Sequence, residues 1–324
     1  MRGRIATALV LGTLAVAAPP MAQTAQAYVR AINDYGAPFY WPTSCATVTI
    51  YLNGFTMMTA DEVAKSIAAA AHAWSPSEVT CPGPGPDGGG DGGSTHPYFE
   101  IIPSLSSGGP VPEVGYDGKN SIIFQTTDWV DSAEVIAATS HFSTPDGAIV
   151  DTDIQINAVV GSDWTNLDPG ATGNGHLGDS PIDLQTALTH EFGHFLGLAH
   201  TCVNLGDAPA QPTDDQGAPV PACPSPPSTP DDVPQARSVM WFFVDPSSIT
   251  KRVLSPDDVH AVCDLYPAAQ DPHSCAANLP DDGCGCRTAG GTSAGAATLL
   301  ALAVAGALIR RRRLRSDRDR PAAP

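Results

Sequence analysis

The segment HEFGHFLGLAH, residues 190–200, decides how the whole chain is interpreted. On a helix, His190 and His194 are four residues apart, so their side chains project from one face, one turn above the other. This spacing lets two imidazoles bind one tetrahedral metal ion. Glu191 follows the first histidine and can lean over the open coordination position without binding the metal itself.

Gly197 and His200 complete the segment. A helix that ends in a left-handed residue favours glycine at that position, so Gly197 is predicted to turn the chain back. The turn would bring His200 to the metal from the other side. Three neutral nitrogen ligands with a fourth position left open are the arrangement of a catalytic rather than a structural zinc. A single histidine is more often a core or surface residue, and it is the complete string that favours a metal site.

This complete H-E-x-x-H-x-x-G-x-x-H string resembles that of the metzincin zinc endopeptidases, and the chain is most similar to their matrixin branch. The resemblance covers roughly residues 46–267. It implies an α+β fold: a metzincin-like catalytic domain with a twisted, mostly parallel sheet, an antiparallel edge strand, an active-site helix and a C-terminal helix. It also implies one catalytic Zn²⁺ held by His190, His194 and His200, with Glu191 as the general base.

Residues 238–240, Ser-Val-Met, resemble the Met-turn, which places a methionine, here Met240, beneath the zinc. A methionine after a loop is otherwise more often a core residue. Some metzincins carry a tyrosine ligand just past this turn, but Trp-Phe-Phe follows here at 241–243. The sequence Ser-Pro-Asp-Asp at 255–258 caps a helix that resembles the last helix of matrixin catalytic domains. Residues 201–236, rich in Pro, Asp and Ala, depart from the compact matrixin pattern.

Apolar periodicity predicts the other elements. Alternation over 47–52 indicates a half-buried strand. Thr59-Ala60-Asp61-Glu62 is a capping box that begins a helix, which Pro76 ends. Further strands are expected at 98–102, 121–125, 135–141 and 149–157. The residues between Cys81 and Thr95 are nearly all Gly, Pro, Asp and Ser, which indicates a flexible linker rather than a calcium loop.

Two expectations concern the start of the helix that carries His190 and His194, called the zinc helix here, and the strand along which a substrate would bind. Ser180 is the expected N-cap of the zinc helix, with Pro181 at its first position and Asp183 three residues after the cap. By the matrixin resemblance, the strand at 149–157 is the sheet edge along which an extended substrate binds. The alternative is a simple edge strand whose polar face, with Asp151 and Asp153, is in water.

Composition favours export. Arg2 and Arg4, a short apolar run and a small-x-small site predict a signal peptide over residues 1–27. Residues 28–287 carry seven Lys and Arg against 32 Asp and Glu, a net charge of −25. Nucleic acid is a poor partner for such a surface. The acidic surface is compatible with bound Ca²⁺, although a solvated acidic surface is the commoner explanation.

Eight cysteines in an exported chain suggest disulfides. Local pairing would join Cys45 to Cys81, Cys202 to Cys223 and Cys263 to Cys275, but spacing alone does not fix the connectivity. No Pro-Arg-Cys-Gly-x-Pro-Asp latency string occurs. Cys45 could instead cap the zinc, although a disulfide is the commoner use of such a residue.

The C-terminal end is predicted to be a separate module. A linker over 271–289 contains Cys284 and Cys286, an apolar segment at 290–309 is just long enough to span a bilayer, and an Arg-rich tail over 310–324 would stay cytoplasmic. This order resembles the MYXO-CTERM class of bacterial sorting tails, which are cut near the cysteine. The alternative is an ordinary C-terminal anchor.

Together these features predict a matrixin-like zinc metallopeptidase domain over residues 28–270. The expected protein is an exported, monomeric zinc-dependent endopeptidase that acts on protein or peptide substrates. It would be at the cell surface or extracellular, and anchored to the membrane at least transiently through the tail. The alternatives are a cell-surface adhesin or binding module that keeps the fold without turnover, and a metal-dependent hydrolase with a non-peptide substrate. Glu191 argues against the binding module, because binding alone has no use for a base.

Overall fold

The computed structural model describes residues 28–82, 96–129, 131–132, 134–159, 164–167, 181–203, 211–224 and 233–275. The expected signal peptide over 1–27, the cysteines at 284 and 286, the apolar segment at 290–309 and the Arg-rich tail lie outside these residues. Most of the loop after Cys81 also lies outside them. None of the helices within the described ranges has the length and apolar character needed to cross a membrane.

The fold is α+β with a mixed, mostly parallel sheet. Five strands are arranged in the order β2-β1-β3-β5-β4, and β4 alone runs antiparallel to its neighbour. The strands are β1 (Cys45–Tyr51), β2 (Glu100–Leu105), β3 (Ser121–Gln125), β4 (Ala137–Ser143) and β5 (Ile149–Asn157). A two-stranded pair, β6 (Trp164–Thr165) and β7 (Ile182–Asp183), lies apart from this sheet. The expected mostly parallel sheet with an antiparallel edge strand is thus confirmed.

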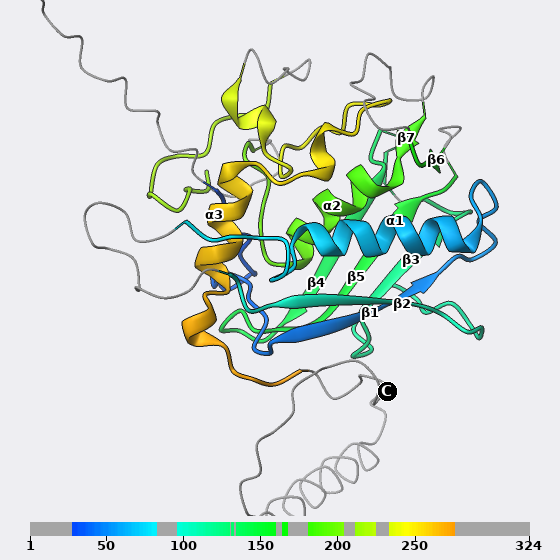
Figure 1. Cartoon of the computed structure of the whole chain (residues 1–324), viewed down its shortest axis with the longest axis horizontal. Coiled ribbons are helices and arrows are strands. Elements are labelled where there is room, and N and C mark those ends of the chain that lie inside the picture. Colours follow the sequence, from blue (N-terminus) through cyan, green and yellow to red (C-terminus); the bar gives the residue numbers. More distant parts are fainter. Residues whose placement is uncertain are drawn as a thin grey trace, which may run out of the picture. The chain divides into compact units, whose positions relative to one another are not determined.

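In the described ranges, three α-helices accompany the sheet: α1 (Ala60–Ala73), α2 (Leu184–Phe195) and α3 (Pro256–Leu265). Helices α1 and α2 cover the same face of the sheet, as Figure 1 shows. Short 3₁₀ turns lie at Pro234–Arg237, Thr250–Arg252 and Ala268–Gln270. The side chain of Trp74 joins the two sheet-covering helices, since its indole Nε1 donates to the carbonyl oxygen of Thr189 at 2.9 Å. Helix α2 is thus bonded directly to the residue that ends α1.

The capping predictions for α1 and α3 are confirmed. Thr59 and Glu62 form a reciprocal capping box before α1, and Ser255 and Asp258 form another before α3. In each box the N-cap hydroxyl accepts from a backbone N–H of the first turn, and the acidic side chain accepts from the N-cap N–H. Both helices thus begin where local sequence chemistry predicts.

The predicted start of α2 is wrong. The N-cap is Asp183, whose Oδ2 accepts from the backbone N–H of Thr186 at 2.8 Å, and the first helical residue is Leu184. Pro181 lies before the helix, because Ile182 and Asp183 pair with β6 as the short strand β7. Arg252 donates from Nε to the same Asp183 oxygen at 2.8 Å. The expected cap at Ser180 lies outside the described residues.

The predicted identity of the edge strand is also wrong. β5, at 149–157, lies between β3 and β4, so β4 is the edge strand on that side of the sheet and β2 is the edge strand on the other. Asp151 and Asp153 are buried rather than wet. Their carboxylates accept the backbone N–H groups of Gly115, Asp117 and Gly118 from the connection between β2 and β3, at 2.8–2.9 Å. These bonds allow a polar face to pack inside the protein.

The described residues form three disulfides, and two of the three local pairings are wrong. Cys202 pairs with Cys223 as expected, but Cys45 pairs with Cys275 and Cys81 with Cys263. The two unexpected bridges join residues 230 and 182 positions apart: one links the start of β1 to the segment that follows α3, and the other links Cys81 to α3 itself. Since Cys45 is in a disulfide, its thiol is not available to cap a metal.

Candidate metal centre

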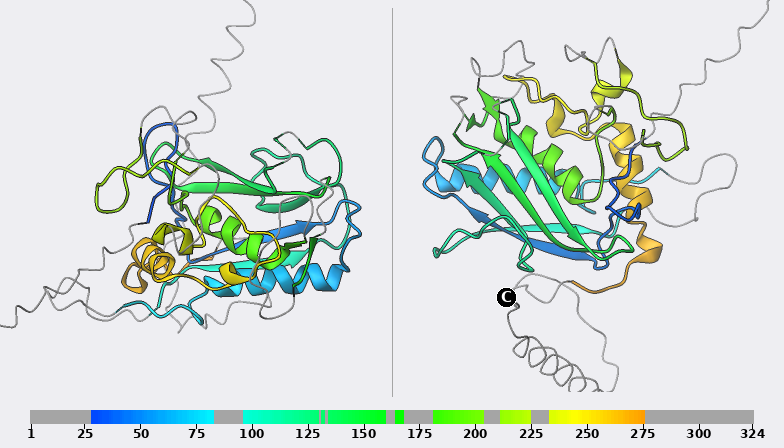
Figure 2. Two further views of the ribbon diagram at one scale, coloured as in Figure 1. Left: turned by 90° about the horizontal axis from the view of Figure 1, so that it is seen from above. Right: turned by 180° about the vertical axis from the view of Figure 1, so that it is seen from behind.

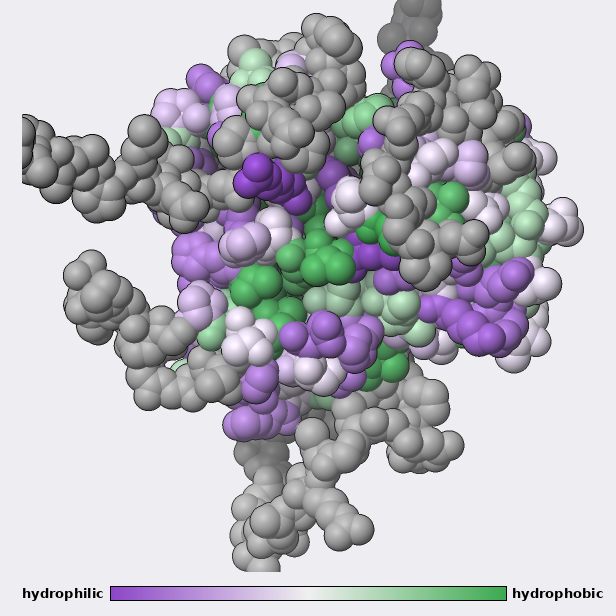
Figure 3. Space-filling model, turned by 45° about the horizontal axis from the view of Figure 1, so that its top comes forward, coloured by the Kyte–Doolittle hydropathy of each residue, from purple (hydrophilic) through white to green (hydrophobic). Residues whose placement is uncertain are grey.

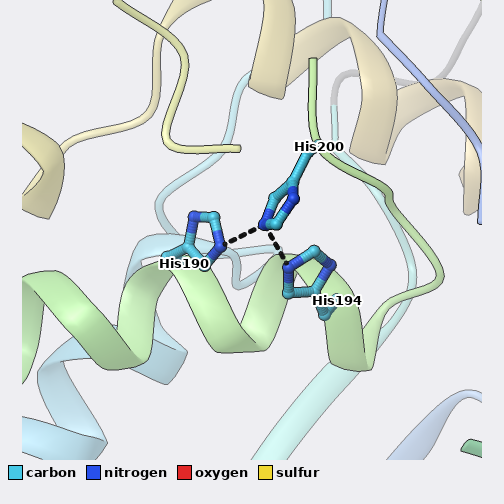
Figure 4. Close-up of side chains that lie close together, drawn as sticks. All are labelled: His190, His194 and His200. Atoms are coloured by element: carbon cyan, nitrogen blue, oxygen red, sulfur yellow. Dashed lines mark hydrogen bonds between the residues drawn. The ribbon is translucent and has the colours of Figure 1, made fainter. Parts of the chain in front are cut away.

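Helix α2 and the turn after it bring the three motif histidines together (Figure 4). The Nε2 atom of His200 lies 3.1 Å from the Nε2 atom of His190 and 3.1 Å from that of His194. His190 and His194 project from one face of α2, as their spacing predicts. His200 lies on the segment that follows α2 and its turn, and it is the third member of the group. All three predicted ligands therefore point their Nε2 atoms at one place.

Backbone carbonyls fix the orientation of two of these rings. The Nδ1 atom of His190 lies 2.7 Å from the carbonyl oxygen of Val239, and Nδ1 of His194 lies 2.8 Å from that of Leu198. A carbonyl only accepts, so each Nδ1 must carry the proton, and in the neutral ring Nε2 then presents a lone pair. Burial lowers the pKa of His190 well below its ordinary value, and the neighbouring histidines lower it further.

This set of donors fits a metal ion. Converging imidazole lone pairs repel one another unless a cation lies between them, and neutral imidazole nitrogens are preferred ligands of Zn²⁺. Hydrogen bonds from the opposite ring nitrogen to carbonyl oxygens are the usual way to orient such ligands. Burial also lowers the pKa of His200 to about 3, which keeps this ring neutral near pH 7.

Gly197 makes the turn that returns the chain. Its φ is +98°, in the left-handed region, and a Cβ there would lie 2.7 Å from the carbonyl oxygen of Phe39. The N–H of Gly197 donates to the carbonyl oxygen of His194 at 2.7 Å, and that of Leu198 donates to Gly193 at 3.0 Å. The predicted requirement for glycine is thus both conformational and steric.

Met240 lies beneath the histidine helix. It is buried, and a Cβ added at Gly193 would come within 2.1 Å of its sulfur atom. Asp258 of α3 bonds to the turn at residues 238–240. Its carboxylate accepts from the hydroxyl of Ser238 at 2.6 Å and from the backbone N–H of Val239 at 2.9 Å. Since Val239 is the residue whose carbonyl orients His190, α3 supports the candidate metal centre through this turn.

Glu191 lies in the same cleft as the histidines. Its Oε2 accepts a hydrogen bond of 2.6 Å from the hydroxyl of Thr139, in the edge strand β4. The carboxylate is buried, and burial raises its pKa. Its second oxygen is not engaged by Thr139 and can accept a proton from another group.

The cleft has a volume of about 500 Å³ and lies between β4 and the histidines. Two other depressions are larger, at about 610 Å³ each, but neither contains a motif histidine. One of them is lined by alanines of α1 together with Val253 and Leu254, and Figure 3 shows hydrophobic surface gathered on the side of the molecule where α1 lies. The chemistry of the lining residues, rather than size, therefore identifies the candidate site.

Sequence reasoning missed several supporting residues. Thr139 fell inside a predicted strand, but nothing in its alternation shows that its hydroxyl faces the glutamate. His141, whose Nε2 lies 2.8 Å from the carbonyl oxygen of His194, was missed for the same reason. Lys251 is buried and donates from Nζ to the carbonyl oxygen of Ser238 at 3.0 Å. A lone lysine between the predicted elements gives no sequence signal for this contact with residue 238.

No protein-family model matches the sequence, and no curated protein matches it at a significant level. The spacing of the motif and the geometry of the site are accordingly the grounds on which a function can be assigned.

Proposed function

We propose that this protein is an exported zinc-dependent endopeptidase of the metzincin clan, similar to the matrixins. The observation that carries the proposal is the juxtaposition of three converging histidine Nε2 atoms with the buried carboxylate of Glu191, in a cleft bordered by an edge strand. Binding alone would need the histidines, but it would not need a carboxylate beside them. Met240 and the turn around it support the proposal as the Met-turn.

His190, His194 and His200 would hold the ion. When bound, Zn²⁺ supplies a Lewis acid for the scissile carbonyl and lowers the pKa of water toward neutrality. Val239, Leu198 and Asp258 keep the histidine rings oriented through the contacts described above. These supporting groups reduce the motion of the ligands. A catalytic metal site requires ligands that are held in a fixed geometry.

Glu191 is the general base in this proposal. It accepts the proton of the attacking water and returns it to the nitrogen of the leaving amine. Thr139 holds one carboxylate oxygen, so that the other is available for proton transfer. The carboxylate acts on a proton and not as a nucleophile, so no covalent intermediate with the protein forms.

The substrate would be an extended peptide bound along β4, rather than along the strand at 149–157. Within the described residues β4 pairs with β5 on one side, and its other side borders the cleft. A free strand edge binds an extended peptide through main-chain hydrogen bonds, with pockets for alternate side chains. This mode suits protein substrates better than a compact small molecule.

Export is part of the proposal, as are the sorting tail and the membrane anchor that the sequence predicts. The three disulfides support export, because disulfides persist in oxidising compartments. Protein or peptide substrates remain the expected partners of a monomeric enzyme. Neither Ca²⁺ nor the cleavage of the tail is needed for the chemistry above.

The test is hydrolysis of casein, or of another unfolded protein, by the purified protein with and without a chelator. The proposal expects cleavage within the chain, its loss on chelation, and its return when Zn²⁺ is added back. Binding of the protein substrate without any cleavage, in the presence of Zn²⁺, would favour the adhesin or binding module instead. Cleavage that persists after complete removal of metal would contradict the mechanism.

A further inference from the structure

A second cluster of metal-ligating side chains lies outside the cleft. Asp215, from the segment that follows the zinc motif, lies beside His260 and Asp264 of α3, and one ligand atom of each is within 4.8 Å of the others. His260 and Asp264 are one helical turn apart, with Nε2 and Oδ2 separated by 3.5 Å. Two ligands bound to one tetrahedral Zn²⁺ at about 2.0 Å would be separated by about 3.3 Å.

Tyr28 fixes the positions of these groups. Its hydroxyl donates to Oδ2 of Asp264 at 3.2 Å, and its ring contacts the His260 ring edge-on, with 5.7 Å between ring centroids. The backbone N–H of Asp215 donates to the carbonyl oxygen of Tyr28 at 3.0 Å. Figures 1 and 2 show the N-terminal segment (dark blue) and residues 211–224 (yellow-green) beside α3 (orange). The three ligands therefore meet on a supported surface rather than on a free loop.

Negative charge around the cluster is poorly balanced. Asp214 and Asp264 act electrostatically on Asp215, and His260 is the opposing group. In the described part of the chain, neither Asp215 nor Asp264 forms an ion pair with lysine or arginine. A cation at the cluster would reduce this repulsion.

A second, independent observation is a buried carboxylate nearby. Asp257 is only 4 % exposed, and its Oδ1 has no hydrogen-bond partner among the described residues. Asp257 also interacts electrostatically with Asp215 and Asp214. A buried carboxylate oxygen without a partner is costly, and a nearby cation lowers that cost.

We propose that Asp215, His260 and Asp264 bind a divalent transition-metal ion such as Zn²⁺, which clips the segment after the zinc motif to helix α3. One imidazole with two carboxylates is a donor set suited to Zn²⁺, whereas Ca²⁺ prefers six to eight oxygen ligands. The clip would act together with the Cys202–Cys223 disulfide, which closes the same segment on itself. It would also fix α3, whose Asp258 holds the turn beneath the histidine helix.

The probe is Zn²⁺ alone, with the amount bound to the whole purified protein measured by equilibrium dialysis and elemental analysis. The parent is expected to bind two ions per chain. His260→Asn and Asp215→Asn should each bind one ion and retain hydrolysis of casein. His72→Asn is the matched control, because His72 is another surface histidine, 3.8 Å from the carboxylate of Glu78, and this variant should bind two.

The second site is tested separately from the proposed function by using His194→Asn, which removes a ligand of the cleft. This variant should keep one Zn²⁺, and the double variant His194→Asn/His260→Asn should keep none. Zn²⁺, but not Ca²⁺ at the same concentration, should raise the melting temperature of His194→Asn. Equal Zn²⁺ binding by the parent and His260→Asn would overturn the clip, as would a parent that binds one ion and loses it in His194→Asn. A response to Ca²⁺ alone would overturn the choice of metal.

Discussion

The hydroxyl of Thr139 lies 2.6 Å from Oε2 of Glu191 and donates to it. This hydrogen bond joins the edge strand β4 to helix α2, which carries His190 and His194. The strand that would bind substrate and the carboxylate that would move the proton are thus in direct contact, and His141 of the same strand also bonds to the helix, at the carbonyl oxygen of His194. The bond also determines which carboxylate oxygen is left for chemistry, so Thr139 is a positioning residue for the proposed base.

Thr139→Val should lower kcat and leave KM nearly unchanged, because the isosteric valine removes the hydroxyl without altering the shape of the cleft. Hydrogen bonds to charged groups contribute roughly 1.5–3 kcal/mol, which corresponds to roughly a 10- to 160-fold loss in rate if the geometry depends on the bond. Thr139→Ser, which keeps a hydroxyl, should restore most of the rate. Steady-state kinetics on a peptide substrate would measure both variants, and a change confined to KM would contradict the positioning role.

Gly193→Ala should destabilise the protein, because the added Cβ would overlap the sulfur of Met240. Overpacking of this kind costs typically about 1–3 kcal/mol. Met240→Ala should also destabilise, but the double variant should be less destabilised than the sum of the two single variants, since the clash is then removed. Urea unfolding of the four proteins gives the coupling. Additive effects would show that Gly193 and Met240 are not in contact.

A third prediction concerns the pH dependence of stability. Burial raises the pKa of Asp257 from its ordinary value of 3.8 to about 7, and the charges of Asp258, Asp215 and Asp214 add to the effect. Between these two values the folded protein keeps a proton that the unfolded chain loses, so Asp257 makes stability fall as the pH rises from about 4 through 7. Asp257→Asn should remove this contribution.

The melting temperature of Asp257→Asn, relative to that of the parent, should therefore be higher at pH 8 than at pH 5. The comparison is made with a chelator present, so that no added metal ion neutralises the carboxylates. For a domain of this size about 1 kcal/mol corresponds to roughly 2–4 °C. The same difference between variant and parent at both pH values would show that Asp257 has an ordinary pKa.

Disulfide connectivity gives a fourth prediction. Digestion without reduction should recover Cys45 linked to Cys275, Cys81 linked to Cys263 and Cys202 linked to Cys223. Mass spectrometry of the linked peptides identifies each pair, and the same digest after reduction is the control. A peptide that links Cys45 to Cys81 would contradict the arrangement of β1 and α3 in this fold.

Features with a local physical cause could be predicted from the sequence. The capping boxes at Thr59 and Ser255 depend on side chains three residues apart. The convergence of the histidines depends on helical spacing and on one glycine. These interactions involve neighbouring residues, so the residues themselves specify the geometry.

Features that depend on distant pairing could not be predicted. Alternation identified the strand at 149–157, but it did not show that β4, rather than β5, forms the sheet edge. The start of α2 was missed because the two residues before it form β7, which pairs with β6 at Trp164–Thr165. The local sequence around residue 180 does not show this pairing. The partners of Cys45 and Cys81 lie 230 and 182 residues away, and the proximity of Thr139 to Glu191 depends on how the strand packs against the helix.

The most direct test of the central claim is Glu191→Gln, measured for both zinc content and peptide hydrolysis. Glutamine keeps the shape and the hydrogen bond from Thr139 but cannot accept the proton of a water molecule. The variant should bind as much Zn²⁺ as the parent and melt at a similar temperature, while casein hydrolysis falls at least about 100-fold. Hydrolysis at the parental rate by Glu191→Gln, with the same zinc content, would contradict the proposed mechanism.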